Sequence, residues 1–165
     1  MGISTGYQFS GNKGFAVAAE VDKLTQVSKS TALSYGLMLE NIFEAKDKGG
    51  SMTSIMLSGG FQVRQPHNAW FWGAKLLAGF GEYPVVNKGS TDYYVYEDHC
   101  AKPCLRGALQ LTTGFKIGKC SQIFCSVRTG AHFGKSMDYE GFDESSTDNL
   151  LGFDLGASLG YGFTF

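Results

Sequence analysis

Charged side chains recur at regular positions in this chain, and their spacing is suited to a network of ion pairs. Acids lie in three segments and bases in four others, always at the parity of the small or polar residues. If these segments are β-strands, side chains of one parity face one side of the sheet, where acids can meet bases. The residues expected in this network are Glu20, Glu40, Glu44, Arg64, Lys75, Arg106, Lys116, Arg128, His132 and Asp154, with Asp22 on the same side.

Two roles are open to such a network. Buried charges need partners, so paired side chains can simply fill the space that the strands enclose. The alternative is a gate, in which the ions exchange partners and open a narrow ion path. The residue types alone do not distinguish the two, and we expect the structural role.

Strict period-two alternation marks the elements that would position these charges. It is clearest over residues 151–165, where Leu, Phe, Ala and Tyr alternate with Gly, Asp, Ser and Thr. Such alternation indicates strands that each have one apolar and one polar face. A chain of this length is expected to form a single domain, 1–165, in which the strands enclose one interior. The eight segments that carry it are 2–10, 14–22, 31–44, 51–64, 69–82, 105–117, 121–135 and 151–165. If residues 1–10 are instead a disordered arm, seven strands remain.

The last eight residues carry a more specific pattern, with a polar residue, a glycine and two aromatics at Ser158, Gly160, Phe163 and Phe165. This pattern resembles the C-terminal assembly signal of bacterial outer-membrane β-barrels. The whole chain resembles the small, eight-stranded (OmpA/OmpX-like) members of that group. The resemblance implies an all-β fold, a transmembrane antiparallel up-and-down β-barrel in the outer membrane of a Gram-negative bacterium. It also implies two kinds of partner, outer-membrane lipid and the barrel-insertion machinery that would recognise the last strand.

The composition agrees with a barrel and excludes other classes. No apolar run reaches the ~18 residues of a membrane helix, while a mean hydropathy of -0.09 is compatible with strands that face a polar lumen. The net charge of -1, without a basic stripe, predicts no binding to nucleic acid. No charged and apolar leader follows Met1, which we interpret as a mature chain whose export signal was removed; a cytoplasmic protein is the alternative.

Outward aromatic residues are expected to form two girdles around an apolar belt. The girdle expected at the periplasmic end comprises Tyr35, Phe61, Trp70, Trp72, Phe115, Tyr161, Phe163 and Phe165. The girdle expected at the other end comprises Phe9, Phe15, Phe43, Phe80, Phe133 and Phe153. In a soluble sandwich or a lipocalin-like barrel the same residues would form the core. The small, glycine-rich opposite face argues against a solvent-exposed surface of that kind.

Two long connections, 83–103 and 136–147, are expected as external loops, whereas 65–68 and 118–120 are tight turns and 23–30 is of intermediate length. Tyr93, Tyr94 and Tyr96 make the first loop a candidate binding surface, because tyrosine is large, stiff and amphipathic. The second loop is acidic and could hold a divalent cation or be merely solvated. Cys100 and Cys104 could form a disulfide, remain free thiols, or contribute to a metal site.

Catalysis is not expected, and neither a cofactor nor a metal is predicted. One outer-membrane family that removes an acyl chain from lipid A uses a histidine and a serine two residues later, but here Gly134 follows His132. The expected function is a structural or adhesin-like surface protein that binds partners through its loops. The alternatives are an accessory subunit of a larger outer-membrane complex, with partners on the barrel wall, a narrow ion pore, an acyl-modifying enzyme and a soluble lipid binder.

Overall fold

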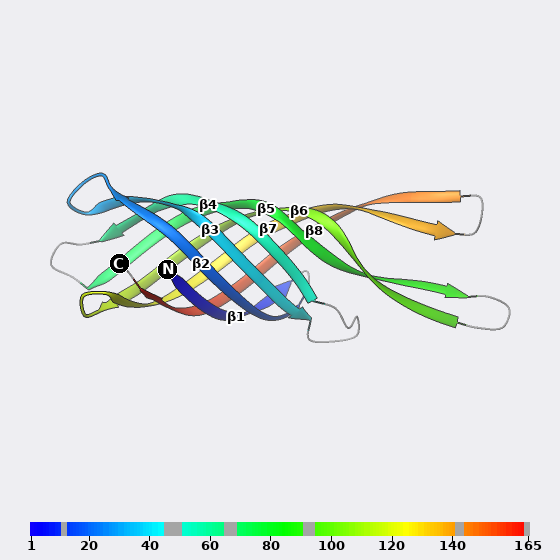
Figure 1. The fold of residues 1–165 in the computed structure, drawn as a ribbon, viewed down its shortest axis with the longest axis horizontal. Helices are drawn as coiled ribbons and strands as arrows, with labels where there is room; N and C mark the ends of the chain where they lie inside the picture. The colour runs from blue at the N-terminus through cyan, green and yellow to red at the C-terminus, as the bar shows by residue number, and fades with distance from the viewer. Residues whose placement is uncertain (11–12, 45–50, 65–68, 91–94, 141–143, 164–165) are drawn as a thin grey trace.

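Eight antiparallel β-strands follow one another along the chain and close into a ring in the computed structural model (Figure 1). The structure describes residues 1–10, 13–44, 51–64, 69–90, 95–140 and 144–163. The strands are β1 (Gly2–Ser10), β2 (Gly14–Gln26), β3 (Thr31–Glu44), β4 (Ser51–Arg64), β5 (Trp70–Ser90), β6 (Val95–Ile117), β7 (Ser121–Glu140) and β8 (Glu144–Phe163). Each strand pairs with its neighbours in the chain, which confirms the expected up-and-down order. Within the described residues, no helix is long and apolar enough to cross a membrane.

The first and last strands close the ring. They pair from Gly2 opposite Gly162 to Ser10 opposite Leu155, with one irregularity after Gln8. The Met1 ammonium donates a hydrogen bond to the carbonyl of Phe163 at 2.9 Å, and the amide of Phe163 donates to the carbonyl of Met1 at 2.7 Å. Residues 2–10 are therefore a strand and not an arm. We call the end of the ring that carries both termini the terminal end and the opposite end the hairpin end (Figure 1).

The strands point small and polar side chains inward and large apolar ones outward. The inside holds two apolar clusters, one of Ala16, Ile42, Met52 and Cys104 and the other of Ala18, Met38, Met56 and Leu77. Outside, Leu57 and Leu76 are 69% and 68% exposed. Many other large hydrophobic residues share this outer face, so the ring has the inverse of the usual distribution in a soluble protein.

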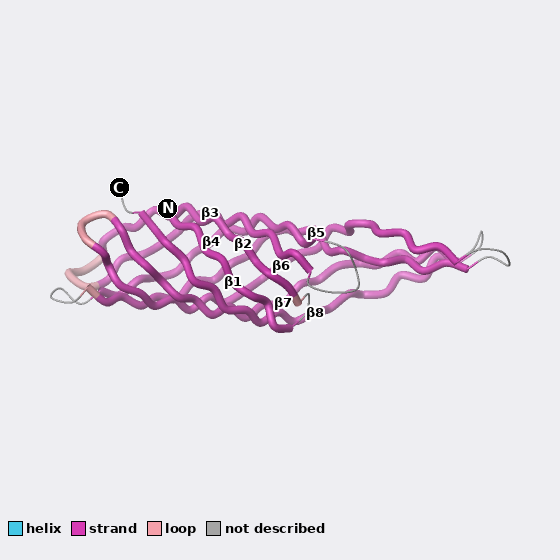
Figure 2. The backbone as a smooth tube through the Cα atoms, turned by 90° about the horizontal axis from the view of Figure 1, so that it is seen from below, coloured by secondary structure: helices cyan, strands magenta, loops and turns pink. Residues whose placement is uncertain are grey.

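Two hairpins extend beyond the ring at the hairpin end (Figure 2). β5 pairs with β6 as far as Ser90 opposite Val95, although the pairing of β4 with β5 ends at Gly81. β7 and β8 likewise pair as far as Glu140 opposite Glu144. The expectation of loops over 83–103 and 136–147 is therefore wrong, because most of both segments is strand. A two-stranded ribbon outside the ring has no enclosed side, so it lacks the alternation that revealed the other strands.

The disulfide considered between Cys100 and Cys104 is not formed. Both residues lie on β6, and Cys104 is a buried free thiol. Four residues of extended strand separate their Cα atoms by about 13 Å, roughly twice the distance that a disulfide spans. The same extended pairing, with Cys100 opposite Val85 and Cys104 opposite Gly81, excludes a tight turn between them.

The connections at the terminal end are short. β2 runs on to Gln26, so the segment expected as a connection over 23–30 is reduced to residues 27–30. The hydroxyl of Ser28 caps this turn by accepting hydrogen bonds from the amides of Ser30 (3.3 Å) and Thr31 (3.1 Å). Gly118 begins the β6–β7 turn with a φ of 77°, a backbone conformation that favours glycine.

Candidate functional site

A buried ion cluster connects opposite sides of the ring interior. The Arg106 guanidinium on β6 donates to Glu40 on β3 at 2.6 Å and to Asp154 on β8 at 3.0 Å. These three residues are at most 5% exposed. The two carboxylates thus share one guanidinium, whose planar fork suits this geometry.

Further polar side chains complete the cluster. Arg128 donates to Glu40, and the hydroxyl of Ser54 accepts from Arg106 at 2.9 Å. Asp154 also accepts a hydrogen bond from the amide of Gln8 at 2.8 Å, and its carboxylate lies 3.3 Å from Nδ1 of His132. Side chains from six strands therefore meet here, and the charges are compensated within the cluster.

A glycine on β8 makes room for the histidine of this cluster. A Cβ atom placed at Gly152 would lie 2.2 Å from the His132 ring. Gly160 likewise makes room for Phe124, because a Cβ atom placed at Gly160 would lie 2.2 Å from the Phe124 ring. The inward glycines of β8 thus leave space for the bulky side chains of His132 and Phe124 on β7.

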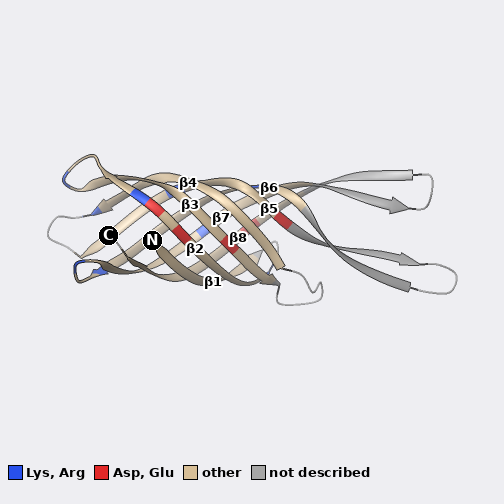
Figure 3. Cartoon of the chain, in the orientation of Figure 1, with Lys and Arg blue, Asp and Glu red and all other residues tan. Residues whose placement is uncertain are grey.

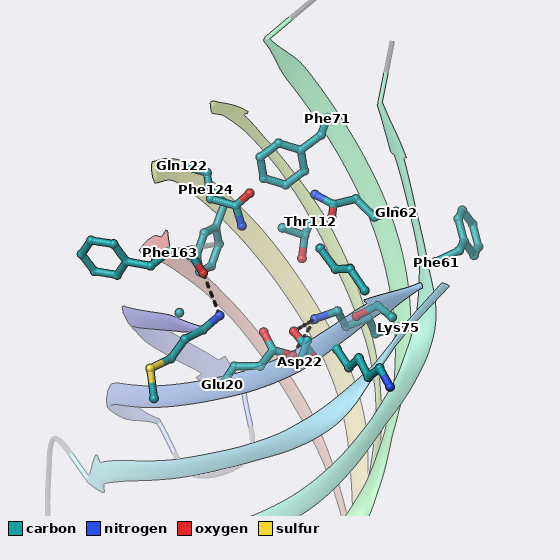
Figure 4. Close-up of a pocket in the computed structure, with 16 residues that line it drawn as sticks. Glu20, Asp22, Phe61, Gln62, Phe71, Lys75, Thr112, Gln122, Phe124 and Phe163 are labelled. Atoms are coloured by element: carbon teal, nitrogen blue, oxygen red, sulfur yellow. Dashed lines mark hydrogen bonds and ion pairs between the residues drawn. The ribbon is translucent and has the colours of Figure 1, made fainter. Parts of the chain in front are cut away.

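A second cluster lies nearer the terminal end. The Lys75 ammonium on β5 lies 2.8 Å from Glu20 and 2.5 Å from Asp22, both on β2 (Figure 4). Ser58 on β4 donates to the other oxygen of Asp22 at 3.0 Å. This cluster is less buried than the first, with side chains 14–16% exposed.

A cavity of about 390 Å³ occupies the terminal end of the interior, beside the Lys75 cluster. Phe71, Phe124, Gln62 and Gln122 lie around it (Figure 4), and Ser34 contributes a buried hydroxyl that has no hydrogen-bond partner among the described residues. Near Glu40 and Arg128 the interior narrows to a void of about 20 Å³. That void has room for about one water molecule, so the first cluster fills the ring.

The remaining residues of the expected network occupy other places. Arg64 lies at the terminal end, where it donates to Gln62 at 3.3 Å and stacks on the Phe71 ring at 5.8 Å. Lys116 is half-buried and, within the described part of the chain, pairs with no acid. The side chain of Glu44 lies outside the described residues, as do those of Tyr93, Tyr94, Tyr96, Cys100 and Phe165.

The residues of the expected assembly signal lie along β8. The hydroxyl of Ser158 is 2.7 Å from that of Ser126, inside the ring, and Gly160 faces the Phe124 ring. Phe163 points outward and packs edge-to-face against Tyr161, with ring centroids 4.8 Å apart.

Sequence reasoning missed three neutral partners of the charged residues, namely Gln8, Ser54 and Ser58. Their parity is that of the inward face in β1 and β4, so the same alternation could have identified them. Buried charges need hydrogen bonds as well as counter-ions, so inward polar residues near the charged ones are the signal that identifies such partners.

The chemistry available to this interior is limited by its burial. His132 is 3% exposed inside the ring, so a substrate on the outer face cannot reach its ring. In the described residues, no group of His, Cys, Asp and Glu is arranged to hold a metal ion. What the geometry does provide is a set of compensated charges that ties the strands together.

These features define a class of protein: an all-β chain whose eight up-and-down strands close into a ring with a polar, ion-paired inside and an apolar outside. No protein-family model matches the chain, and no curated protein matches it.

Proposed function

We propose that the chain is an integral β-barrel of a bacterial outer membrane, with a filled lumen, and that it serves as a structural or surface-binding protein through its two hairpins. The observation that carries the proposal is the outer face. Its apolar residues would each be exposed to water in a soluble protein, whereas lipid would cover them.

The dimensions of that face suit a bilayer. On β5, ten residues separate Trp70 from Phe80, which is about 33 Å along a strand. With the usual barrel tilt of about 40°, this corresponds to about 25 Å along the axis, the height of the apolar band of outer-membrane barrels. The neighbouring strand continues both ends of this band, because Phe115 lies opposite Trp70 and Leu105 lies opposite Phe80.

The filled interior favours a structural role over a pore. The cluster around Arg106 spans the lumen, and apolar side chains occupy the space on both sides of it. An ion entering from the terminal end would reach the cavity and then meet the ion pairs of Glu40.

The hairpins favour surface binding. From Glu82 to Ser90, β5 continues for nine residues, or about 30 Å, past the last pairing with β4. A protein that only filled the membrane would not need such projections. Because short turns face the periplasm and long connections face outward in this class, the hairpins would lie on the cell surface.

The first test is where the protein resides. Cell envelopes containing the native chain are washed with alkaline carbonate and then extracted with mild detergent, and the extracted species is sized. Release by carbonate, or recovery in the soluble fraction, would contradict the proposal and favour a lipocalin-like soluble barrel. A single chain in a micelle supports the surface-protein function.

The second test concerns the hairpins. Tyr83 and Lys102 face each other in register, so residues 84–101 can be replaced by Asn-Gly, which closes a two-residue hairpin. The matched variant replaces 136–148, between the paired Lys135 and Asn149. Cells that display either protein are tested for attachment to cultured epithelial cells and to extracellular matrix. Unchanged attachment by both variants, with the barrel folded, would refute surface binding.

A second candidate function is that of an accessory subunit in a larger outer-membrane complex. It is favoured by an aromatic patch on the wall, where Trp70 packs on Phe115 with ring centroids 4.1 Å apart and Trp72 packs on Phe61 at 5.6 Å. Recovery of a large, stable assembly in detergent would support this function. Substitution of both tryptophans by leucine should then release the barrel.

A further inference from the structure

The small net charge of the chain conceals a strong separation of charge between the two ends of the ring. The segments 23–30, 64–69 and 116–120, which form strand ends and turns of the terminal end, carry five basic residues and no acid. These residues are Lys23, Lys29, Arg64, Lys116 and Lys119. Figure 3 shows basic residues at the tips of this end and acidic residues further along the strands. The segments 13, 44–51, 82–103 and 135–149, which belong to the other end, carry eleven acidic and six basic residues. We call the five basic residues the basic rim.

Several side chains of the basic rim are free to contact what surrounds the ring. Lys23, Lys29 and Lys119 are exposed. Lys23 points to the outer face, where its ammonium lies 5.9 Å from the centroid of the Tyr35 ring. Unlike Lys75, which is neutralised by Glu20 and Asp22 in the interior, these three lysines have no carboxylate near them among the described residues.

The two tryptophans of the chain and part of its tyrosines mark the terminal end of the ring wall. Both tryptophans and the outward Tyr35 and Tyr161 lie at the terminal end. On the ring wall at the hairpin end, the described outward aromatic residues are phenylalanines apart from Tyr7 beside Phe9, and five further tyrosines belong to the hairpin segments beyond the wall. Indole and phenol groups prefer the hydrated headgroup layer, since they combine an apolar ring with a hydrogen-bonding group.

We propose that the three exposed lysines of the basic rim, Lys23, Lys29 and Lys119, bind the phosphates of anionic phospholipid headgroups in the leaflet that surrounds the terminal end. This inference rests on the proposed membrane location and specifies the class of lipid that contacts the terminal end. Lys23 lies beside Tyr35 of the aromatic girdle, and Lys29 and Lys119 lie in the turns just beyond the girdle, where lipid phosphates are expected. Each lysine near an anionic surface contributes about a fivefold increase in affinity. The acidic hairpin end would be repelled by the same lipids, so the separation of charge also favours one orientation of the barrel.

The experiment compares folding equilibria in two kinds of vesicle, phosphatidylcholine alone and phosphatidylcholine mixed with phosphatidylglycerol. The native chain should have the larger folding equilibrium constant in the mixed vesicles, and added salt should reduce the difference. The variant Lys23→Gln, Lys29→Gln, Lys119→Gln should lose about a hundredfold of that preference, at about fivefold for each lysine. The matched control is Lys13→Gln, which removes an exposed lysine from the hairpin end and should retain the preference.

The outcomes separate this proposal from the proposed function. Equal equilibrium constants in both vesicles, or an equal loss in the Lys13 control, would overturn lipid binding by the basic rim while leaving the membrane barrel intact. Failure of the native chain to fold into either vesicle would overturn the membrane location, and the lipid proposal with it. A preference for phosphatidylglycerol that only the triple variant loses would support both.

Discussion

Replacement of Leu76 by arginine tests whether the outer face of the ring meets lipid or water. Leu76 lies on β5, four residues from Trp72 and four from Phe80, with its side chain 68% exposed. It is therefore in the middle of the apolar belt, about 13 Å along the strand from either girdle.

Water and lipid on the outer face predict different losses of folding free energy for Leu76→Arg. If the outer face meets water, the substitution is a surface change worth within about 0.5 kcal/mol. If it meets lipid, an arginine near the bilayer midplane costs about 2–4 kcal/mol, which lowers the folding equilibrium constant by about 30- to 900-fold. The smallest lipid cost is thus about four times the largest surface cost.

The assay is urea titration of the folded chain in phosphatidylcholine vesicles, followed by the fluorescence of Trp70 and Trp72. Val27→Arg is the positional control, because Val27 is 62% exposed but lies in the turn beyond the girdle of the terminal end. It should cost no more than about 1 kcal/mol, the value near the interface. Equal and small costs for the two substitutions would refute the argument that lipid covers the belt.

Two further predictions concern the interior. Arg106→Ala leaves the carboxylates of Glu40 and Asp154 buried without their shared cation and should lower the folding free energy by about 3–5 kcal/mol. In the same titration, Lys116→Ala should lower it by less than about 1 kcal/mol. Similar losses for the two variants would contradict the roles assigned to Arg106 and Lys116. Gly152→Ala forces a Cβ against His132 and should cost about 1–3 kcal/mol. His132→Ala in the same chain should remove part of that cost, and strictly additive effects in the double-mutant cycle would show that the contact is not the cause.

The sequence was sufficient to predict the strands that form the wall of the ring. β3 and β4 have the bounds that alternation predicted, 31–44 and 51–64, because both faces of these strands have a clear polarity. Alternation succeeds wherever one face is enclosed and the other is covered by apolar residues. The expected ring of eight antiparallel strands is confirmed for the same reason.

The sequence was insufficient to predict the strands of the two hairpins, because a hairpin outside the ring encloses no interior. The hairpins contain Pro84 and Pro103 and lie beyond the ring, so neither their composition nor their periodicity distinguishes them from loops. The sequence also could not predict which residues of the ion network contact one another. Parity places Arg106 on the inner face, but only the stagger of the closed strands decides that it meets Glu40 and Asp154 and that Lys116 meets no acid.

The seam between β1 and β8 connects the ion network to the order of assembly. Gln8 donates to Asp154 across this seam, and Arg106 reaches Asp154 from β6. Until the first and last strands meet, the carboxylate of Asp154 lacks the Gln8 amide and both strand edges are unpaired. Each unsatisfied group of that kind costs several kcal/mol in hydrocarbon. We therefore expect the seam to close before the wall is surrounded by lipid, or at the same time.

Cysteines at Thr5 and Leu159 can time this closure, because the two residues face each other in register on the outer face. Their Cα atoms would lie about 4.5–5.5 Å apart, within the range for a disulfide. In a chain whose four native cysteines are replaced by serine, the new disulfide should form no later than protection from protease during folding into vesicles. Protection that clearly precedes the cross-link would mean that an open sheet is stable in lipid. The buried network would then not require closure, and Asp154 would have to find its partners inside the bilayer.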